Sequence, residues 1–541
     1  MKKFIITLFA ATSITVNALN DSIKELYRDD FNTFIRLLEE THPDPYTAFG
    51  GRIEFRREAQ RMRDVAQRSA DAAEFRSHLS AFTARLEDGH TFIIGPNATA
   101  TNQPCTDKFF PIVFKIASDG LFIHYASNEY TRYTGDKLLA LNKIPTDSLL
   151  RKISTITPTE NKYGAMLALR NRIANECFAA AFLAETSPVT LTLQDTDGNI
   201  RDVDVAYNEN PAWNKPQSEL KTRDDNKLLY GQMLENNPNI GYFVWNAMVS
   251  REAVESTPPS NPQYQRMLNY VTGLLGIEKQ DDDNAAVRQI PELYPAFNAL
   301  LTEMKKQQSE YLIIDLRENT GGMTPLTLPL LYMLYGDKYL NYESNAQYIQ
   351  RISPLLLQKR GITADVLSEK TGNVPGDYEF RRFFQSDDGK TIEEKRKDPS
   401  FIAYRNNFAR EFTGHLNGKP VYEPRVIVLC SPETFSAAYH FLYYLSEIGN
   451  ATIVGVPPSQ AGNAFMESTF FELPNTQTRG SISNAKQVLF PGNNEKGKIF
   501  TPDFPMAWAD FAKYNFDKNA EILYCLDLIK REKIHHEIPM R

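Results

Sequence analysis

A serine and a histidine stand four residues apart in VIVLCSPETFSAAYHF, residues 426–441, and a serine beside a base can act as a nucleophile. An apolar run typical of a buried strand precedes Ser436, and apolar residues then recur at helical spacing until Gly449. The pattern predicts Ser436 in the first turn of a helix, where backbone N–H groups favour a developing oxyanion. A simpler interpretation is that Ser436 only caps the helix, because serine is a favoured N-cap residue.

The neighbouring His440 is not expected to be the base. It stands one helical turn beyond Ser436, so its side chain would lie over the preceding turn or in the helix packing. A base must come within about 2.6–3.2 Å of the serine hydroxyl, which is hard to reach from the same short helix. We therefore predict a structural role for His440 and a base from elsewhere in the chain.

A second stretch, YLIIDLRENTGGMTPL at residues 311–326, runs from an apolar strand into paired glycines. Gly321 and Gly322 would free the backbone to present N–H groups at the carboxyl end of the sheet, where open α/β sheets bind ligands. A tight turn is the alternative interpretation. The glycine spacing matches neither the dinucleotide nor the P-loop pattern, so a nucleotide is not expected. Asp315 and Arg317 are expected to hold this loop by hydrogen bonds.

A third stretch, LEDGHT at residues 86–91, contains a turn at Asp88 and Gly89 that would project His90. A lone histidine after a turn is usually only a turn residue, so this stretch alone does not identify a base. HPDPY at residues 42–46 is interpreted as a helix end followed by a proline turn, and HHE at residues 535–537 as solvated. QDDDN at residues 280–284 is interpreted as a solvated loop rather than a metal site.

The elements that must position these residues fall into three regions of a multidomain α/β chain. Residues 1–18 (MKKFIITLFAATSITVNA) are expected to be a signal peptide cleaved after Ala18, without a lipid anchor, and no later segment is apolar enough for a membrane span. Residues 19–98 show helical spacing, and residues 99–215 predict a mixed domain with a hairpin turning at Asp197 and Gly198. Residues 216–541 alternate strand and helix, as in a parallel sheet covered by helices, with a polar excursion near 340–420.

Charge and cysteine content narrow the possible partners. The formal net charge of −7 argues against a nucleic-acid partner, because phosphate binding needs clustered Lys and Arg. Four cysteines in so long a chain do not make a disulfide framework. Cys430 and Cys525 stand in apolar patterns and are expected to be buried. Cys105 and Cys177 could pair, and the sequence leaves this open.

Several motifs together resemble those of the tail-specific and tricorn-core serine peptidases. They are DGHT, DLRENTGG, SPETFSAA, GVPPSQAG at residues 455–462 and TPDFP at residues 501–505, in this order. GDKLLALNKIP at residues 135–145 also resembles part of the PDZ-like domain that such proteins carry. The resemblance implies a catalytic domain of the ClpP and crotonase type, with a helical N-terminal domain and a PDZ-like domain at 99–215.

The resemblance also distinguishes between two catalytic arrangements. In the Ser-Lys branch, a lysine follows the serine by about 25 residues, but this sequence has Asn463 there, and Lys486 comes too late. The sequence therefore resembles the Ser-His-Glu branch, in which Ser436 would be the nucleophile and His90 the general base. The orienting acid would be Glu495, the nearest carboxylate before the Pro502–Asp503 pair although offset by about one residue. A solvated loop charge is the alternative interpretation of Glu495.

The resemblance places the oxyanion hole at the backbone N–H of Ala437 together with that of Gly321 or Gly322, and it implies that Gly322→Val abolishes turnover. The expected protein is an exported periplasmic or extracellular serine endopeptidase that acts on polypeptides and needs no metal or organic cofactor. A PDZ-like domain would recruit or gate the substrate. Two alternatives stay open: a non-catalytic peptide-binding or lipophilic-ligand-binding protein on the same scaffold, and an esterase, although the G-x-S-x-G elbow is missing.

Overall fold

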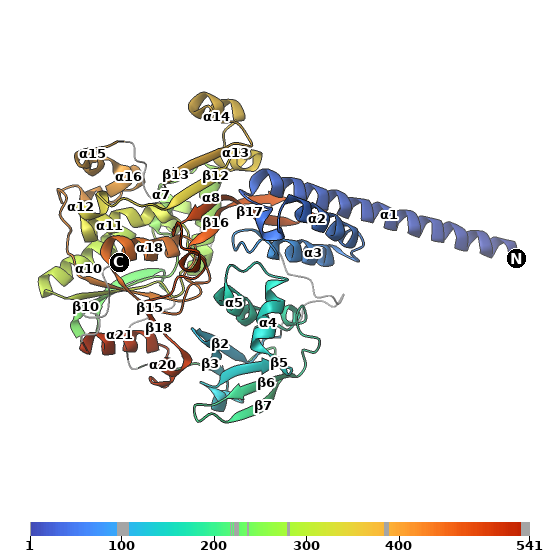
Figure 1. Ribbon diagram of the computed structural model, residues 1–541, viewed down its shortest axis with the longest axis horizontal. Coiled ribbons are helices and arrows are strands. Elements are labelled where there is room, and N and C mark those ends of the chain that lie inside the picture. Colours follow the sequence, from blue (N-terminus) through green and yellow to red (C-terminus); the bar gives the residue numbers. More distant parts are fainter. Residues whose placement is uncertain are drawn as a thin grey trace.

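Three sheets with helices between them make up the protein, which confirms the mixed α/β multidomain fold. The computed structural model describes residues 2–94, 108–216, 218, 220, 227–234, 237–278, 282–382 and 389–531. In Figure 1 the blue N-terminal helices lie on the right, the teal segment lies below, and the green to red remainder forms the left part. Every helix within the described residues is too short or too polar to span a bilayer.

The N-terminal segment is helical, as its apolar spacing predicts. Its three long helices are α1 (Lys2–Thr41), α2 (Arg52–Ala66) and α3 (Ala72–Ala84). Their apolar faces meet in a core rich in phenylalanine, which Phe471, Leu473 and Ile482 from the far end of the chain complete. The short strand β1 (Phe92–Ile94) then pairs antiparallel with β17 (Arg479–Val488). The helical segment therefore packs directly on the C-terminal part of the chain.

A seven-stranded sheet occupies the middle of the sequence. Its strands are β2 (Ile112–Ala117), β3 (Gly120–Ser127), β4 (Lys137–Leu141), β5 (Ile144–Pro145), β6 (Val189–Gln194), β7 (Ile200–Val205) and β8 (Trp213–Asn214). The helices beside it are α4 (Thr146–Ser154), α5 (Lys162–Ile173) and α6 (Glu176–Ala179). The hairpin predicted at Asp197 and Gly198 joins β6 to β7. Cys177 in α6 is disulfide-bonded, and Cys105 lies outside the described residues.

A six-stranded sheet forms the centre of the C-terminal half, in the order β18-β15-β14-β11-β10-β9. The strands are β9 (Leu229–Leu234), β10 (Asn237–Trp245), β11 (Tyr311–Asp315), β14 (Arg425–Cys430), β15 (Thr452–Gly455) and β18 (Phe504–Pro505). All neighbours are parallel except β9 and β10. Every residue of β11 is buried, as its continuous apolar run predicts.

Helices and the middle segment bury the two faces of this sheet. One face packs against α10 (Leu293–Gln307), α11 (Thr327–Tyr335) and α18 (Ala437–Gly449). The other face packs against α21 (Ala520–Lys530) and shares its core with the seven-stranded sheet. Cys430 and Cys525 are buried free thiols in these two layers, as expected.

The segment near 340–420, predicted to be a polar excursion, contributes two strands to a sheet. Two of its strands, β12 (Gln347–Arg351) and β13 (Tyr378–Arg382), extend a five-stranded antiparallel sheet that also holds β1, β17 and β16 (Asn463–Glu472). Its helices are α12 (Asp337–Leu340), α13 (Pro354–Arg360), α14 (Ala364–Thr371), α15 (Ile392–Lys397), α16 (Pro399–Ile402) and α17 (Arg410–Thr413). The remaining helices are α7 (Arg251–Glu255), α8 (Pro262–Leu275), α9 (Asp283–Val287), α19 (Asn494–Lys498) and α20 (Trp508–Ala512).

Candidate active site

Ser436 lies where two parallel strands end. The loops after β11 and β14 meet at the carboxyl edge of the six-stranded sheet, which is where open α/β sheets place their sites. Ser436 directly precedes α18 and has φ 55° and ψ −122°, a strained conformation for a residue with a side chain. Its hydroxyl makes no capping bond to the helix. The interpretation of Ser436 as a simple helix cap is therefore wrong.

The hydroxyl of Ser436 faces His90 instead. Nε2 of His90 lies 3.2 Å from Oγ of Ser436, although 346 positions separate the two residues. The pairing of β1 with β17 brings His90 beside Ser436. The hydroxyl of Thr91 strengthens this pairing because it accepts a hydrogen bond from the backbone N–H of Ser483 at 3.0 Å. The ring of Phe435 stacks on that of His90 at 4.8 Å and 28°. The structure thus brings together the serine and the histidine that the sequence singled out.

The environment of His90 favours a neutral imidazole. The side chain is buried, and burial lowers its pKa, an effect that the charges of Asp88 and Glu467 and the carbonyl of Phe465 oppose. A neutral ring can accept the proton of Ser436 through Nε2. Its other nitrogen, Nδ1, is buried and makes no hydrogen bond of standard distance and angle among the described residues.

Backbone N–H groups suited to an oxyanion lie beside the serine. A Cβ atom on Gly321 would stand 2.6 Å from Cβ of Ser436, so the glycine loop touches Ser436. The N–H of Gly321 already donates to the side chain of Asn319 at 2.9 Å. Within the described parts of the chain, the N–H groups of Gly322 and Ala437 have no such acceptor. Of the two glycines, Gly322 is therefore the better candidate donor beside Ala437.

Gln460 contacts Ser436, and sequence analysis did not single out this glutamine. Its Oε1 accepts the backbone N–H of Ser436, which helps to hold the strained backbone of the serine. The side chain is fully buried, and its Nε2 has no partner in the described structure. The stretch GVPPSQAG did draw attention, but only as a motif match, and nothing in its spacing marked the glutamine.

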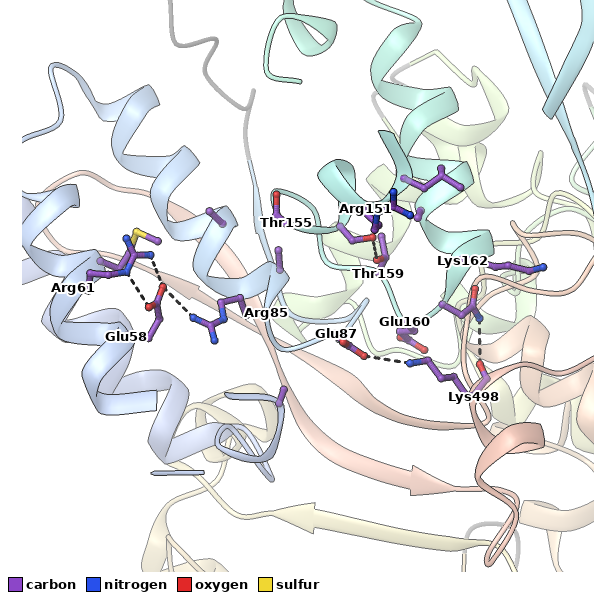
Figure 2. A pocket seen from close by; sticks show the side chains of 18 residues that line it. Glu58, Arg61, Arg85, Glu87, Arg151, Thr155, Thr159, Glu160, Lys162 and Lys498 are labelled. Carbon is purple, nitrogen blue, oxygen red and sulfur yellow. Dashed lines mark hydrogen bonds and ion pairs between the residues drawn. The ribbon is translucent and has the colours of Figure 1, made fainter. Parts of the chain in front are cut away.

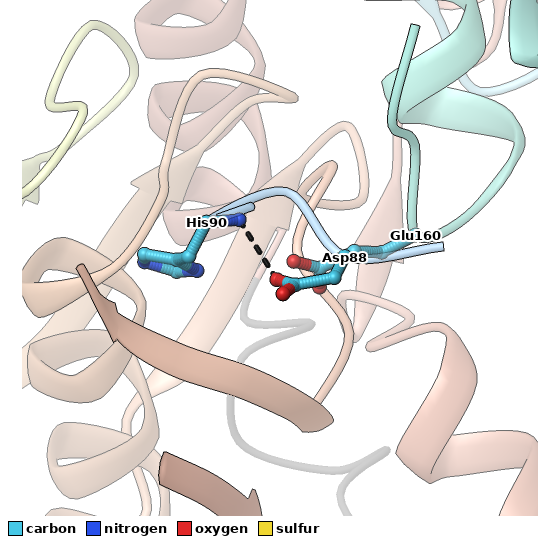
Figure 3. Close-up of side chains that lie close together, drawn as sticks. All are labelled: Asp88, His90 and Glu160. Carbon is cyan, nitrogen blue, oxygen red and sulfur yellow. Dashed lines mark hydrogen bonds between the residues drawn. The ribbon is translucent and has the colours of Figure 1, made fainter. Parts of the chain in front are cut away.

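A buried group of polar side chains lies on the other side of His90 (Figure 3). Nε2 of His42 is 3.2 Å from Oδ2 of Asp88, and the N–H of Asp44 donates to Nδ1 of His42 at 3.1 Å. Because Nδ1 accepts, a neutral His42 carries its proton on Nε2 and donates it to Asp88. The interpretation of residues 42–46 as a simple turn missed this contact, which joins positions 46 apart.

Glu160 connects three parts of the molecule at the same place. Its carboxyl group accepts the N–H of Gly89 at 3.1 Å and that of Ala461 at 2.7 Å. Gly89 belongs to the His90 turn, Glu160 to the middle segment and Ala461 to the loop after β15. No signal in the sequence pointed to Glu160, because its partners are backbone groups far away in the chain.

Asp88, His90 and Glu160 offer atoms that all lie within 4.8 Å of one another, which raises the question of a metal site. Both oxygens of Asp88 already accept hydrogen bonds, and so do both oxygens of Glu160. Nε2 of His90 faces Ser436. This arrangement suits proton transfer better than metal binding.

His440 has the structural position that the sequence predicts. Its Nδ1 contacts Oγ1 of Thr324 at 2.8 Å, and its Nε2 contacts Oε1 of Gln487 at 2.8 Å. Burial lowers its pKa to about 4, so the ring is neutral at physiological pH. Both ring nitrogens are thus engaged away from Ser436.

We predict that His440→Ala keeps a near-normal kcat and loses stability. The change leaves the hydroxyl of Thr324 and the amide of Gln487 without their partner, which costs about 1–3 kcal/mol. Peptide turnover and denaturant unfolding of the same preparation check both parts. A variant that unfolds normally but turns over at less than a hundredth of the normal rate would give His440 a role in the reaction.

The other predicted side chains have contacts away from Ser436 and His90. Glu495 is exposed on α19, and the described structure shows no contact between it and His90. Asn463 bonds to the backbone of Phe490, and Lys486 lies over the ring of Phe465 at 5.2 Å. Neither of these two residues is placed to serve Ser436. The role of Glu495 as the acid stays a prediction.

The expected role of Asp315 and Arg317 in holding the glycine loop is confirmed. Nε and Nη2 of Arg317 donate to the two oxygens of Asp315 at 2.9 and 2.7 Å, and Nη1 donates to Glu521 at 2.7 Å. Tyr242 adds a hydrogen bond to Asp315 at 2.6 Å. This buried network fixes the start of the loop that carries Gly321.

A cavity of about 710 Å³ lies between the helical segment and the middle segment (Figure 2). Its lining carries charges of both signs, including Glu58 with Arg61 and Arg85 on the helical side. Glu160 lines it too, so the cavity reaches the back of the His90 turn. Neither Ser436 nor His90 lines it.

Comparison with known proteins links the C-terminal half to a peptidase family. Residues 286–506 match the model of Peptidase family S41. Mature CPAF has a similar structure, with a TM-score of 0.53 and 14% identity over 93% of this chain and 98% of that one. The photosystem II D1 C-terminal processing protease is matched with a TM-score of 0.37 and 12% identity over 91% and 94% of the two chains. At such identities the likeness to CPAF shows a shared fold. No curated protein sequence matches the chain significantly.

Proposed function

We propose that this serine-type peptidase, whose residues 286–506 match Peptidase family S41, is an exported serine endopeptidase that cleaves peptide bonds through an acyl-enzyme. One observation carries the proposal: the hydroxyl of Ser436 and Nε2 of His90 lie 3.2 Å apart across 346 positions. A hydroxyl in hydrogen-bond reach of a neutral imidazole is the basic unit of nucleophilic acyl transfer. The polypeptide substrate follows from the peptidase family.

The proposed reaction proceeds in two halves. Oγ of Ser436 attacks the scissile carbonyl carbon while its proton moves to Nε2 of His90. The carbonyl oxygen becomes an oxyanion, which the N–H groups of Ala437 and Gly322 stabilise. His90 then gives the proton to the leaving amine as the C–N bond breaks. Water hydrolyses the resulting ester by the same route, and the proton returns to Ser436.

Finer features of the proposal rest on the sequence motifs. Glu495 is the acid that the family resemblance implies, and its exposed place on α19 means that it would have to move or act through water to serve His90. The six-stranded sheet would belong to the ClpP and crotonase type. The domain at 99–215 would be PDZ-like, and its own sheet beside the catalytic one supports a role in recruiting or gating the substrate.

Labelling with a fluorophosphonate tests the proposed nucleophile. Purified residues 19–541 should take up the label and cleave peptides, and Ser436→Ala should do neither. Short-chain esters and peptides compared at matched concentration separate the esterase alternative from the peptidase. A folded protein that takes no label and cleaves neither substrate would instead support the binding-protein alternative.

Export is proposed from the first residues of the chain, and it predicts a mature N-terminus at Leu19. In the structure α1 runs from Lys2 to Thr41, and the buried side chains described in it begin at Tyr27. Removal of residues 1–18 would therefore leave the buried side chains of α1 in place. Mass spectrometry of protein recovered from the medium or the cell envelope measures the N-terminus. An intact Met1 on secreted, active protein would contradict this prediction.

A further inference from the structure

Three donors converge on the carboxylate of Asp88, next to the proposed base. Besides His42, the backbone N–H of His90 donates to Oδ1 at 2.9 Å, and the hydroxyl of Thr91 donates to Oδ2. Asp88 is fully buried. A buried carboxyl group that accepts several hydrogen bonds is held in its ionised form, because each donor stabilises the charge.

Asp88 and the neighbouring Glu160 are pushed toward opposite protonation states. Burial alone would raise the pKa of Asp88, but the hydrogen bond from His42, with further help from His90 and Thr91, outweighs it and lowers this pKa. Burial raises the pKa of Glu160 well above its usual range, although Ala461 and Gly89 donate to it. The charge of Asp88 adds to this rise. The pKa of Asp88 is thus lowered and that of Glu160 raised, so Asp88 is the more readily ionised of the two carboxyl groups.

The negative charge of Asp88 lies close to the imidazole ring of His90. A ring nitrogen of His90 is within 4.8 Å of a carboxylate oxygen of Asp88. Glu467 also faces His90, but it is 41% exposed and pairs with Lys359 at 3.4 Å, so solvent and a cation screen it. The ring of His440 stays neutral on the remaining side. Asp88 is the buried negative charge that acts on His90 with little screening.

We propose that Asp88, held by His42, is a positioning residue that fixes the turn of His90 and stabilises the imidazolium formed when Ser436 loses its proton. It acts on the turn through the N–H of His90 and on the ring through the field of its charge. Asp88 itself takes no proton during the reaction. The inference rests on the proposed serine-peptidase function and assigns part of the role expected of Glu495 to a different carboxylate.

Asp88→Asn tests the inference because asparagine keeps the size and loses the charge. We expect kcat to fall roughly 10²-fold and KM to change little. This is the effect expected for the loss of a unit charge within 4.8 Å of the His90 ring at an effective dielectric constant of about 20. Without the charge that raises the pKa of His90, the acid limb of the pH profile of kcat/KM should move to lower pH. A change that only loosened the fold would lower activity without moving this limb downward. The matched control is Asp195→Asn in the exposed β6–β7 turn, where activity should not change.

Thermal unfolding and fluorophosphonate titration of each preparation give the folded, competent fraction, so that kcat refers to active enzyme. If Asp88→Asn does not fold, His42→Asn keeps the carboxylate and removes its donor, and we expect a smaller fall in kcat than for the charge loss. The inference is overturned by an unchanged kcat and acid limb in the folded variant, or by a larger loss in Glu495→Gln. These outcomes require active wild-type enzyme, whereas a wild type that takes no label would overturn the proposed function itself.

Discussion

His90→Ala and Ser436→Ala should each lower kcat by about 10⁶-fold, and the double variant should be no slower than either single one. The hydroxyl and the imidazole act as one unit, because among the described residues Nε2 of His90 is the basic group in hydrogen-bond reach of the Ser436 hydroxyl. Loss of either partner therefore removes the whole proton-transfer step. Steady-state cleavage of a peptide measures the loss, and fluorophosphonate labelling counts the active fraction of the wild-type enzyme.

The same experiment distinguishes His90 from His440. His440→Ala serves as the control, since His440 is a buried residue of α18 whose ring nitrogens contact Thr324 and Gln487 instead of the Ser436 hydroxyl. If His90→Ala retained more than about a hundredth of the normal rate while Ser436→Ala retained none, a different base would have to serve the serine. An additive double variant would show that the two residues act in separate steps.

Gly321→Ala should lower kcat by at least about 10²- to 10³-fold, the cost typical of a lost oxyanion donor. Gly321 has φ +102°, and a Cβ there would stand 2.6 Å from Cβ of Ser436 and 2.7 Å from the carbonyl oxygen of Phe435. The loop would have to move away from the nucleophile and carry the N–H of Gly322 with it. KM should change much less, because the interaction is made mainly in the transition state. Initial rates over a range of peptide concentrations separate the two constants.

A matched glycine controls for backbone strain alone. Gly372 also has a positive φ, +74°, and a Cβ there would meet nothing within 4 Å. Gly372→Ala should cost about 1 kcal/mol of stability and leave kcat unchanged. Equal activity in the two folded variants would remove the glycine loop from the mechanism.

The sequence predicted those parts of the site that lie on regular patterns. Ser436 stands where a buried strand meets a helix, and the paired glycines follow the neighbouring parallel strand, so the topology of the sheet brings them together. His90 could be assigned only through its motif, because its place depends on three residues of β1 pairing with a strand almost four hundred positions later. The continuous apolar runs of β11 and β14 predicted a parallel sheet covered by helices.

The remaining parts of the site depend on tertiary contacts that leave no local pattern. Gln460 and Glu160 bond to backbone N–H groups, which every residue type offers, so nothing in their own neighbourhood marks them. The pair of His42 and Asp88 joins a helix end to a turn, and only the packing of α1 against the His90 turn shows that the two side chains meet. Glu495 was chosen by its distance along the chain, which does not fix its distance in space.

The docking of the helical segment on β16 and β17 also sets the order in which the enzyme can become active during its synthesis. The proposed base is made early, at position 90, and the proposed nucleophile much later, at position 436. The strand that holds the base in place, β17, begins only at Arg479, and Phe471, Leu473 and Ile482 complete the core beneath it. A nascent chain that already contains its serine therefore still lacks the surface on which His90 must dock. The two halves of the proposed catalytic pair therefore meet only when the chain is almost finished.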